Sequence, residues 1–268
     1  MRLHHLPLAV AALAVLTLAG CTPEAVTPPT ASPPRTVTAS PTTTADAPVV
    51  APTTTSAAPS ASSTATGCPS NGAAAPADAQ SAIDGDLDGD GRDDRVFYSP
   101  GSAEFGIVTA SGAVLTVRDG LAGPGRHSGW AARIAGGAVV MAIADGRGAQ
   151  LFSLQRAGGA CAIRPVENAQ GDQYRFDQER LRGTGTGVGC RVQGGSLQLG
   201  GYDARPTGSG SGPYRVTFTR VVVSPDGRTA TNGPTTVVDP AAASTSATLR
   251  IARDSTCASV PIVGSSGE

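Results

Sequence analysis

Hydrophobic positions from residue 68 onward recur with the two-residue period of β-strands, and helical periodicity is scarce. In the segment 214–219, apolar Tyr, Val and Phe alternate with Arg and Thr, so one face of this stretch is apolar and the other is polar. The segments 104–109 and 113–118 are joined by Ala-Ser-Gly, which is typical of a β-hairpin. We therefore expect antiparallel strands joined by short turns.

The same pattern continues through most of this region. The segments 139–143 and 149–155 flank Asp-Gly-Arg-Gly, and the apolar run 221–223 leads into the turn sequence Ser-Pro-Asp-Gly. Short strands at this spacing predict an all-β domain with a sandwich, barrel or propeller architecture. The only helical signal lies near 178–181, and the glycine-rich segment 183–189 predicts a flexible loop.

The N-terminal pattern is different, because residues 6–19 are almost wholly apolar and follow a short basic start. This run is too short to span a bilayer and is typical of the apolar segment of a secretory signal. It ends in Leu-Ala-Gly ahead of Cys21, which resembles the lipobox of bacterial lipoproteins. The resemblance implies that 1–20 is a removable signal peptide. It also implies a lipid on Cys21, which would anchor the exported protein to the outer face of the bacterial cell membrane.

Residues 21–67 form the predicted tether, which begins with the lipidated cysteine. They consist mainly of Thr, Ala, Pro and Ser and contain no aromatic residue. Such a stretch cannot bury enough apolar surface to offset the conformational entropy that is lost when it becomes ordered, so we expect a disordered linker. The remaining residues, 68–268, have the size of one domain.

Composition narrows the classes of function. Charged residues make up 15% of the chain, the formal net charge is -1, and all 20 basic residues are Arg. A nearly neutral chain does not suit a nucleic-acid binder, and the lack of Lys excludes a P-loop lysine and Schiff-base catalysis. His127 is the only histidine beyond the signal segment, and the sequence contains no G-x-S-x-G elbow. The sequence therefore predicts no catalytic residues and no nucleic-acid partner.

Four cysteines remain after Cys21, namely Cys68, Cys161, Cys190 and Cys257. An even number in an exported domain predicts two disulfides, and the sequence allows three pairings. We expect Cys161–Cys190, which would close a local loop, and Cys68–Cys257, which would tie the two ends of the domain together. The spacings contain no CxxC pair, which disfavours a metal–thiolate site.

Acidic residues concentrate in the segment 84–94, which has the pattern D-x-D-x-D-G-x-x-D from Asp86 onward. Carboxylates at alternate positions converge when such a loop curls, and hard oxygen ligands in this number suit Ca²⁺. Position 12 from Asp86 is Phe97 in a strand pattern, whereas an EF-hand requires a Glu there, so we expect a calcium loop between two strands. The expected ligands are the side chains of Asp86, Asp88, Asp90 and Asp94 and the backbone carbonyl of Arg92.

This loop and the strand pattern after it resemble the calcium loops of FG-GAP and VCBS repeats, which build the blades of β-propellers. The segments 105–112 and 183–190 are similar to secreted actinobacterial VCBS-type proteins. The resemblance implies a β-propeller-like domain stabilised by Ca²⁺. The length of 68–268 allows about four or five blades, and an incomplete propeller also fits this length. The chain shows one such loop where a repeat array would show several, so a β-sandwich is the alternative.

The resemblance also implies a function, because FG-GAP and VCBS domains occur in adhesion and surface proteins. The leading hypothesis is a non-enzymatic binding or adhesion module of the cell envelope, whose ligand is an unidentified envelope polymer, protein or carbohydrate. Two alternatives are a hydrolase of envelope polymers and an accessory structural lipoprotein. A cluster of His, Asp, Glu or Arg at one pocket would favour the hydrolase, and the lack of a ligand pocket would favour the structural protein.

Overall fold

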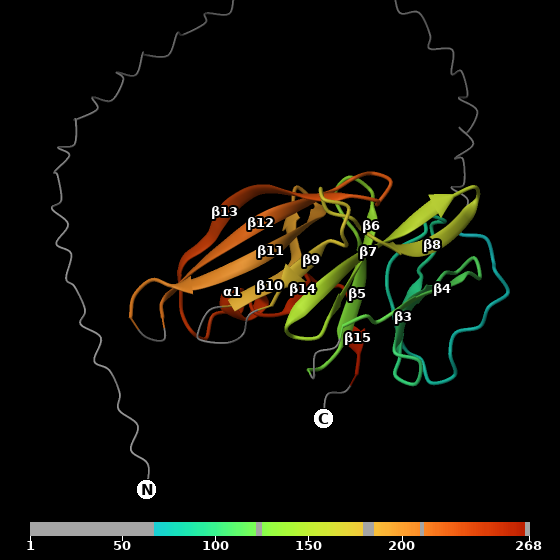
Figure 1. Cartoon of the computed structure of the whole chain (residues 1–268), viewed down its shortest axis with the longest axis horizontal. Coiled ribbons are helices and arrows are strands. Elements are labelled where there is room, and N and C mark those ends of the chain that lie inside the picture. The colour runs from blue at the N-terminus through green and yellow to red at the C-terminus, as the bar shows by residue number, and fades with distance from the viewer. Residues whose placement is uncertain (1–66, 122–124, 179–184, 210–211, 266–268) are drawn as a thin grey trace, which may run out of the picture. The chain divides into compact units, whose positions relative to one another are not determined.

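The computed structural model describes residues 67–121, 125–178, 185–209 and 212–265 (Figure 1). All of these residues belong to one unit of the chain, Pro59–Glu268. The predicted signal peptide, Cys21 and the tether up to residue 66 lie outside the described residues. Within the described part of the chain, no helix has the length and apolar character needed to cross a membrane.

The first sheet is an antiparallel meander of four strands in chain order. Its strands are β1 (Gln80–Ile83), β2 (Arg95–Ser99), β3 (Glu104–Val108) and β4 (Val114–Arg118). The first predicted hairpin is confirmed as β3 and β4, in which Phe105 faces Val117. Gly106 is required on β3, because a Cβ atom there would lie 2.4 Å from both the carbonyl oxygen of Leu115 and the ring of Phe97.

The second sheet contains six strands. They are β5 (Ser128–Arg133), β6 (Val139–Ala144), β7 (Gly148–Ala157), β8 (Ala160–Pro165), β9 (Arg175–Asp177) and β15 (Val263–Gly264). The strands β5 to β8 follow chain order, whereas β15 pairs with β5 and β9 pairs with β7. The hairpin predicted for 139–155 is confirmed as β6 and β7, in which Ala142 faces Leu151.

The third sheet contains five strands. They are β10 (Gly185–Gln193), β11 (Ser196–Pro206), β12 (Tyr214–Val223), β13 (Ala230–Ala242) and β14 (Ser255–Cys257). The strands β10 to β13 form another antiparallel meander, and β14 joins β10 in a parallel pairing. The alternation predicted for β12 is confirmed, because Tyr214, Val216 and Phe218 are buried while Arg215 is exposed.

The glycine-rich segment 183–189 is not the flexible loop that we expected, since strand β10 begins at Gly185. A Cβ atom at Gly189 would lie 2.3 Å from the carbonyl oxygen of Thr256 on β14. Glycine therefore serves here to let two backbones approach closely, and this need outweighs its low strand propensity. Residues 183–184 lie outside the described part.

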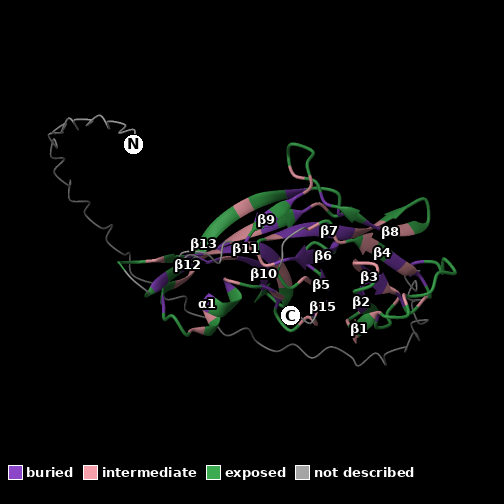
Figure 2. Ribbon diagram, turned by 60° about the horizontal axis from the view of Figure 1, so that its bottom comes forward, coloured by how far each residue is buried: buried purple, intermediate pink, exposed green. Residues whose placement is uncertain are grey.

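The second sheet is the middle layer of the domain, because apolar residues cover both of its faces. All six residues of β6 are buried (Figure 2). Its even-numbered side chains, such as Val140, share a core with third-sheet residues such as Leu199. Its odd-numbered side chains, such as Met141, share a core with first-sheet residues such as Phe105. The uninterrupted apolar run of β6 thus results from burial on both faces, which is uncommon for antiparallel strands.

The single tryptophan lies in the core. Trp130 on β5 is 1% exposed, and its indole Nε1–H donates a hydrogen bond to the Ser255 Oγ on β14 at 3.1 Å. The aromatic side chains of Tyr174, Phe176 and Tyr202 are also buried. Trp130 therefore connects the middle layer to the third sheet by both apolar contact and a hydrogen bond.

A further apolar cluster lies on the third sheet and includes Leu249 of the short helix α1 (Ala247–Ile251). The Ser246 Oγ caps this helix by accepting a hydrogen bond from the Leu249 amide at 3.1 Å. We did not predict α1, because five residues are too few to show helical periodicity. The helical signal near 178–181 is wrong at Gln178, and its other residues lie outside the described part.

The prediction of an all-β domain is confirmed. The described residues form three sheets, none of which closes into a barrel. The sheets pack face to face in a sandwich-like manner, with the second sheet between the other two. The propeller with about four or five blades stays a prediction.

The four cysteines form two disulfides, but the expected pairing is wrong. Cys68 is bonded to Cys161, and Cys190 is bonded to Cys257, with sequence separations of 93 and 67 residues. Cys190 and Cys257 are direct partners in the register of β10 and β14. Strand pairing, rather than nearness along the chain, therefore decides which thiols meet. The Cys68–Cys161 bond joins the segment ahead of the first sheet to strand β8 of the second sheet.

Candidate metal centre

The acidic segment forms the loop between β1 and β2. The two strands pair up to the point where the loop begins, and the Asp84 amide donates to the Asp94 carbonyl at 2.9 Å. Strand pairing therefore brings the two ends of the loop together, and the chain between them must turn sharply. Gly89 and Gly91 allow this turn, because they adopt φ angles of +81° and +83°.

Three of the predicted ligands converge inside this loop. Asp86, Asp88 and Asp94 each place one carboxylate oxygen within 4.8 Å of the others. Asp88 and Asp94 are buried, with 2% and 0% exposure, and Asp86 is half-buried. The two oxygens of Asp86 also accept hydrogen bonds from the amides of Asp90 and Gly91 at 3.1 and 3.0 Å. Three of the four predicted side-chain ligands thus come together.

Asp94 connects the acidic loop to the turn between β3 and β4. Its Oδ2 accepts hydrogen bonds from the amides of Leu87 and Asp88 at 2.8 and 2.9 Å. Its Oδ1 accepts a hydrogen bond from the Ala110 amide at 2.8 Å. These bonds fix the Asp94 carboxylate, and they fix the loop backbone around it.

Asp90 does not join the other three carboxylates. Its Oδ2 forms an ion pair with the Arg92 guanidinium at 2.7 Å, and this hydrogen bond holds the pKa of Asp90 below its usual value. We expected Asp90 to be a side-chain ligand, but the structure pairs its carboxylate with Arg92 instead. Asp90 would have to exchange this partner before it could bind a cation. The predicted ligand role of the Arg92 carbonyl stays a prediction.

The converging carboxylates are electrostatically unfavourable neighbours. Burial raises the pKa of Asp94, and the nearby charge of Asp88 raises it further. Burial also raises the pKa of Asp84 to about 6, with a smaller contribution from Asp94. Like charges in a poorly solvated site are unfavourable unless a proton or a cation compensates them. A cation would supply this compensation, so Asp86, Asp88 and Asp94 could together hold a metal ion through their carboxylate oxygens.

Two residues that the sequence pattern did not reveal hold the Asp88 carboxylate in place. The amide of Cys68 donates to the Asp88 Oδ2 at 2.8 Å, and the Ser111 hydroxyl donates to the same oxygen at 2.9 Å. The Cys68 carbonyl also lies within hydrogen-bond distance of the Ser111 hydroxyl, whose single proton it shares with the Asp88 carboxylate. Because Cys68 is bonded to Cys161, these contacts connect the acidic loop to the second sheet.

Two arginines of the second sheet donate to backbone carbonyls of the loop. The Arg133 Nη2 on β5 donates to the carbonyls of Asp86 and Leu87 at 3.2 and 3.0 Å. Arg156 on β7 donates to the Asp88 carbonyl. No sequence signal marks these arginines, because 47 residues separate Arg133 from Asp86 and 68 separate Arg156 from Asp88. Both arginines therefore bind the backbone of the acidic loop and not its carboxylates.

We expect Arg133→Met to loosen the acidic loop. The variant keeps most of the aliphatic stem but loses the bonds to the carbonyls of Asp86 and Leu87, and bonds from a charged donor contribute about 1.5–3 kcal/mol each. Partial rehydration of the carbonyls reduces this loss, so the melting temperature should fall by about 2–6 °C. Differential scanning calorimetry of the parent and the variant measures the change.

Arg118→Met is the matched control for this experiment. Arg118 is an exposed residue of β4, so its replacement should leave the melting temperature within about 1 °C of the parent. Equal effects of the two substitutions would show that the hydrogen bonds of Arg133 do not stabilise the loop.

The structure also gives His127 a partner that the sequence did not predict. The Nδ1 of His127 contacts the Asp119 carboxylate, whose side chain is 3% exposed. The Asp119 carboxylate also accepts from the Leu121 amide at 2.9 Å. A carboxylate in this position fixes the orientation of an imidazole ring, and such a pair is one part of a hydrolase triad.

The comparisons with known proteins give no family or relative. No protein-family model, curated protein or solved structure matches this chain.

Proposed function

We propose that this protein is a lipid-anchored envelope protein whose calcium-stabilised β domain acts as a non-enzymatic binding or adhesion module. The observation that carries the proposal is the convergence of Asp86, Asp88 and Asp94 in one loop. The resemblance of this loop to FG-GAP and VCBS repeats supplies the link to adhesion. The lipobox-like sequence before Cys21 supplies the link to the membrane.

The proposed role of Ca²⁺ is structural. A bound Ca²⁺ would supply positive charge among carboxylates that otherwise repel one another. The side chains of Asp86, Asp88 and Asp94 would hold it, and Asp90 would join them after release from Arg92. All of these residues come from one loop between two strands, which favours a role in ordering the loop over a role in binding a substrate.

We also propose that the three sheets correspond to the blades of an incomplete propeller, fewer than the four or five blades that the length of 68–268 allows. Three four-stranded antiparallel meanders follow one another along the chain, and neighbouring meanders pack face to face. This order of strands is the one that propeller blades use. The sandwich-like packing of the sheets supports a β-sandwich as the alternative, and an experimental structure that shows whether the sheets surround a common axis distinguishes the two.

The lipid anchor has a direct test. We expect Cys21→Ser to move the full-length protein from the membrane fraction to the soluble fraction, because the substitution removes the thiol that carries the lipid. Immunoblots of fractionated cells measure the distribution. Cys68→Ser is the control, because it removes a cysteine that belongs to a disulfide, and it should leave the protein in the membrane fraction. Retention of the Cys21→Ser variant in membranes would refute the anchor.

The binding function is tested by capture from envelope material. The full-length protein is immobilised and exposed to solubilised cell envelope, with Ca²⁺ or with a chelator. We expect a polymer, protein or glycan to be retained with Ca²⁺ and to be retained less strongly after chelation. An accessory structural role would give no specific retention under either condition.

The alternative function is a hydrolase of envelope polymers, and the contact between His127 and Asp119 is the observation that favours it. Release of soluble fragments from purified envelope, lost in His127→Ala, would support the enzyme and contradict the binding module. We expect no such release, because a carboxylate–imidazole pair without an assigned nucleophile does not complete a catalytic site.

A further inference from the structure

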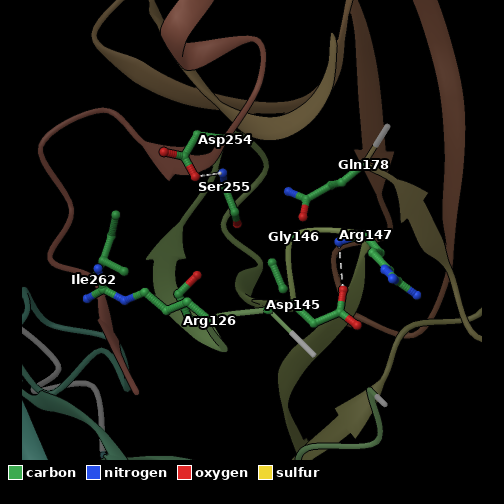
Figure 3. A pocket seen from close by; sticks show the side chains of 11 residues that line it. Arg126, Asp145, Gly146, Arg147, Gln178, Asp254, Ser255 and Ile262 are labelled. Atoms are coloured by element: carbon green, nitrogen blue, oxygen red, sulfur yellow. Dashed lines mark hydrogen bonds between the residues drawn. The ribbon is translucent and has the colours of Figure 1, made fainter. Parts of the chain in front are cut away.

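A cavity of about 600 Å³ lies at one end of the second sheet (Figure 3). It is lined by Ser128 at the start of β5, Asp145 in the turn after β6, Gln178 just after β9, and Ser255 on β14. Its volume falls within the range of roughly 300–1,000 Å³ that is typical of small-ligand sites. The described lining residues belong to the second and third sheets and their connections, so the cavity is separate from the acidic loop.

Gln178 is the unusual residue of this cavity. It is 3% exposed, yet neither its Oε1 nor its Nε2 has a hydrogen-bond partner among the described residues. Its backbone amide donates to the Arg147 carbonyl at 2.8 Å, which fixes the residue beside the turn between β6 and β7. Figure 3 shows that its carboxamide points into the cavity, toward the side on which Ser255 lies.

A buried carboxamide without partners lowers the stability of the folded chain, because its hydrogen bonds to water are lost and not replaced. An apolar side chain of similar size would fill the same place without this loss. Groups of this kind are retained where a ligand completes their hydrogen bonds. The Gln178 carboxamide is therefore suited to a ligand that offers both a donor and an acceptor.

Ser255 provides a second polar group inside the cavity. Its Oγ accepts the hydrogen bond from the indole of Trp130 at 3.1 Å, and the residue is 3% exposed. A hydroxyl group that accepts one bond retains its own proton for donation, so Ser255 can donate to a ligand. The indole bond also keeps the Ser255 hydroxyl in place on β14.

The charged residues that line the cavity balance one another, which bears on the class of ligand. An anion site would concentrate arginines, and a cation site would concentrate carboxylates. Here the lining contains equal numbers of both, namely Arg126, Arg147, Asp145 and Asp254. The balance favours an uncharged ligand that is rich in hydrogen-bonding groups.

We propose that this cavity binds an uncharged sugar residue, held by hydrogen bonds from Gln178 and Ser255. Sugar hydroxyl groups both donate and accept, so two adjacent hydroxyls satisfy both polar atoms of the Gln178 carboxamide. The ligand is one sugar unit of a longer chain, since such a unit fits within about 600 Å³. The source of this sugar, an envelope glycan, rests on the proposed binding function. The chemistry of the cavity does not depend on the calcium loop.

The test uses the full-length protein in mild detergent and a panel of free neutral sugars. The panel contains glucose, galactose, mannose, arabinose and N-acetylglucosamine, and saturation-transfer NMR detects binding of each. We expect at least one sugar to bind, and we expect Gln178→Met to weaken that binding by about 10-fold or more. The melting temperature of Gln178→Met should equal or exceed that of the parent, because the substitution removes an unsatisfied buried amide.

Two further variants complete the design. Gln178→Glu retains the shape of the side chain but replaces the N–H donor, so it should also weaken sugar binding. Gln193→Leu is the control, because Gln193 is an exposed residue at the end of β10, and it should bind sugar as the parent does. The calcium-loop variant Asp88→Asn should retain sugar binding, which separates this inference from the proposed role of Ca²⁺.

Three results would overturn the inference. The first is the absence of binding to every sugar of the panel, which leaves the binding function intact if capture from envelope succeeds. The second is sugar binding that neither Gln178 variant weakens. The third is a large fall in the melting temperature of Gln178→Met, which would show that the carboxamide serves the fold instead of a ligand.

Discussion

Millimolar Ca²⁺ should raise the melting temperature of the full-length protein by about 5–10 °C, and Asp88→Asn should remove this shift. A ligand that binds only the folded state at about 100 times its dissociation constant adds about 2.7 kcal/mol to the free energy of unfolding. For a domain of this size, that energy corresponds to the stated shift. Asp88 is the residue of choice because it is buried and lies between Asp86 and Asp94 in the converging group.

The choice of asparagine keeps other effects small. Asn retains an oxygen that can accept the hydrogen bonds from Cys68 and Ser111, so the loop keeps its anchors while it loses one negative charge. Asp93→Asn is the matched control, since Asp93 is exposed and is not one of the converging residues. The control should keep the full shift. A shift that is absent from the parent, or equal in both variants, would contradict a cation among these carboxylates.

Removal of the Cys68–Cys161 disulfide should produce the other large effect. The bond spans 93 residues, and the loop-entropy model assigns a closure of this length about 4–5 kcal/mol as an upper estimate. The double variant Cys68→Ser with Cys161→Ser should therefore unfold at a denaturant concentration well below that of the parent. It should also bind Ca²⁺ more weakly, because the backbone of Cys68 donates to the Asp88 carboxylate.

The second disulfide provides a comparison inside the same molecule. Cys190 and Cys257 are separated by 67 residues, so their replacement should reduce stability by nearly the same amount. It should leave the affinity for Ca²⁺ unchanged, because both cysteines belong to the core between the second and third sheets, whereas Leu87 of the acidic loop belongs to the other core. Urea denaturation and calcium titration of both double variants measure the two quantities. Equal losses of calcium affinity would contradict the proposed coupling through Cys68.

Local sequence patterns predicted the hairpins but not the layers. The alternation in β12 and the turn between β3 and β4 each involve neighbouring residues, so the sequence alone reveals them. The order of the layers depends on which face of β6 packs against which sheet. Because β6 is apolar on both faces, its sequence does not indicate which sheet covers which face. The glycines of β10 misled for a related reason. Their role becomes visible only when β14 lies beside them.

The sequence likewise predicted only the part of the candidate site that comes from neighbouring residues. Asp86, Asp88 and Asp94 are close in sequence, and their spacing predicted that they would converge. Asp90 departs from the pattern because Arg92, two residues away, takes its carboxylate. The supporting groups come from distant strands, such as Arg133, which lies 47 residues from Asp86, and only the packing of the sheets brings them to the loop. The disulfide pairing was mispredicted for the same reason, because strand pairing brings together cysteines that are far apart in the sequence.

The last two strands of the described chain have a consequence for the order in which the sheets form. β14 and β15 pair with β10 and β5, the first strands of the third and second meanders, so residues 263–264 complete a sheet that begins at Ser128. Neither sheet has its full set of strands until residues 255–264 are available to pair. Such non-local pairing slows folding, because long loops must close before their contacts form. The second and third sheets should therefore be completed late in folding, after nearly all of the described chain is available to pair.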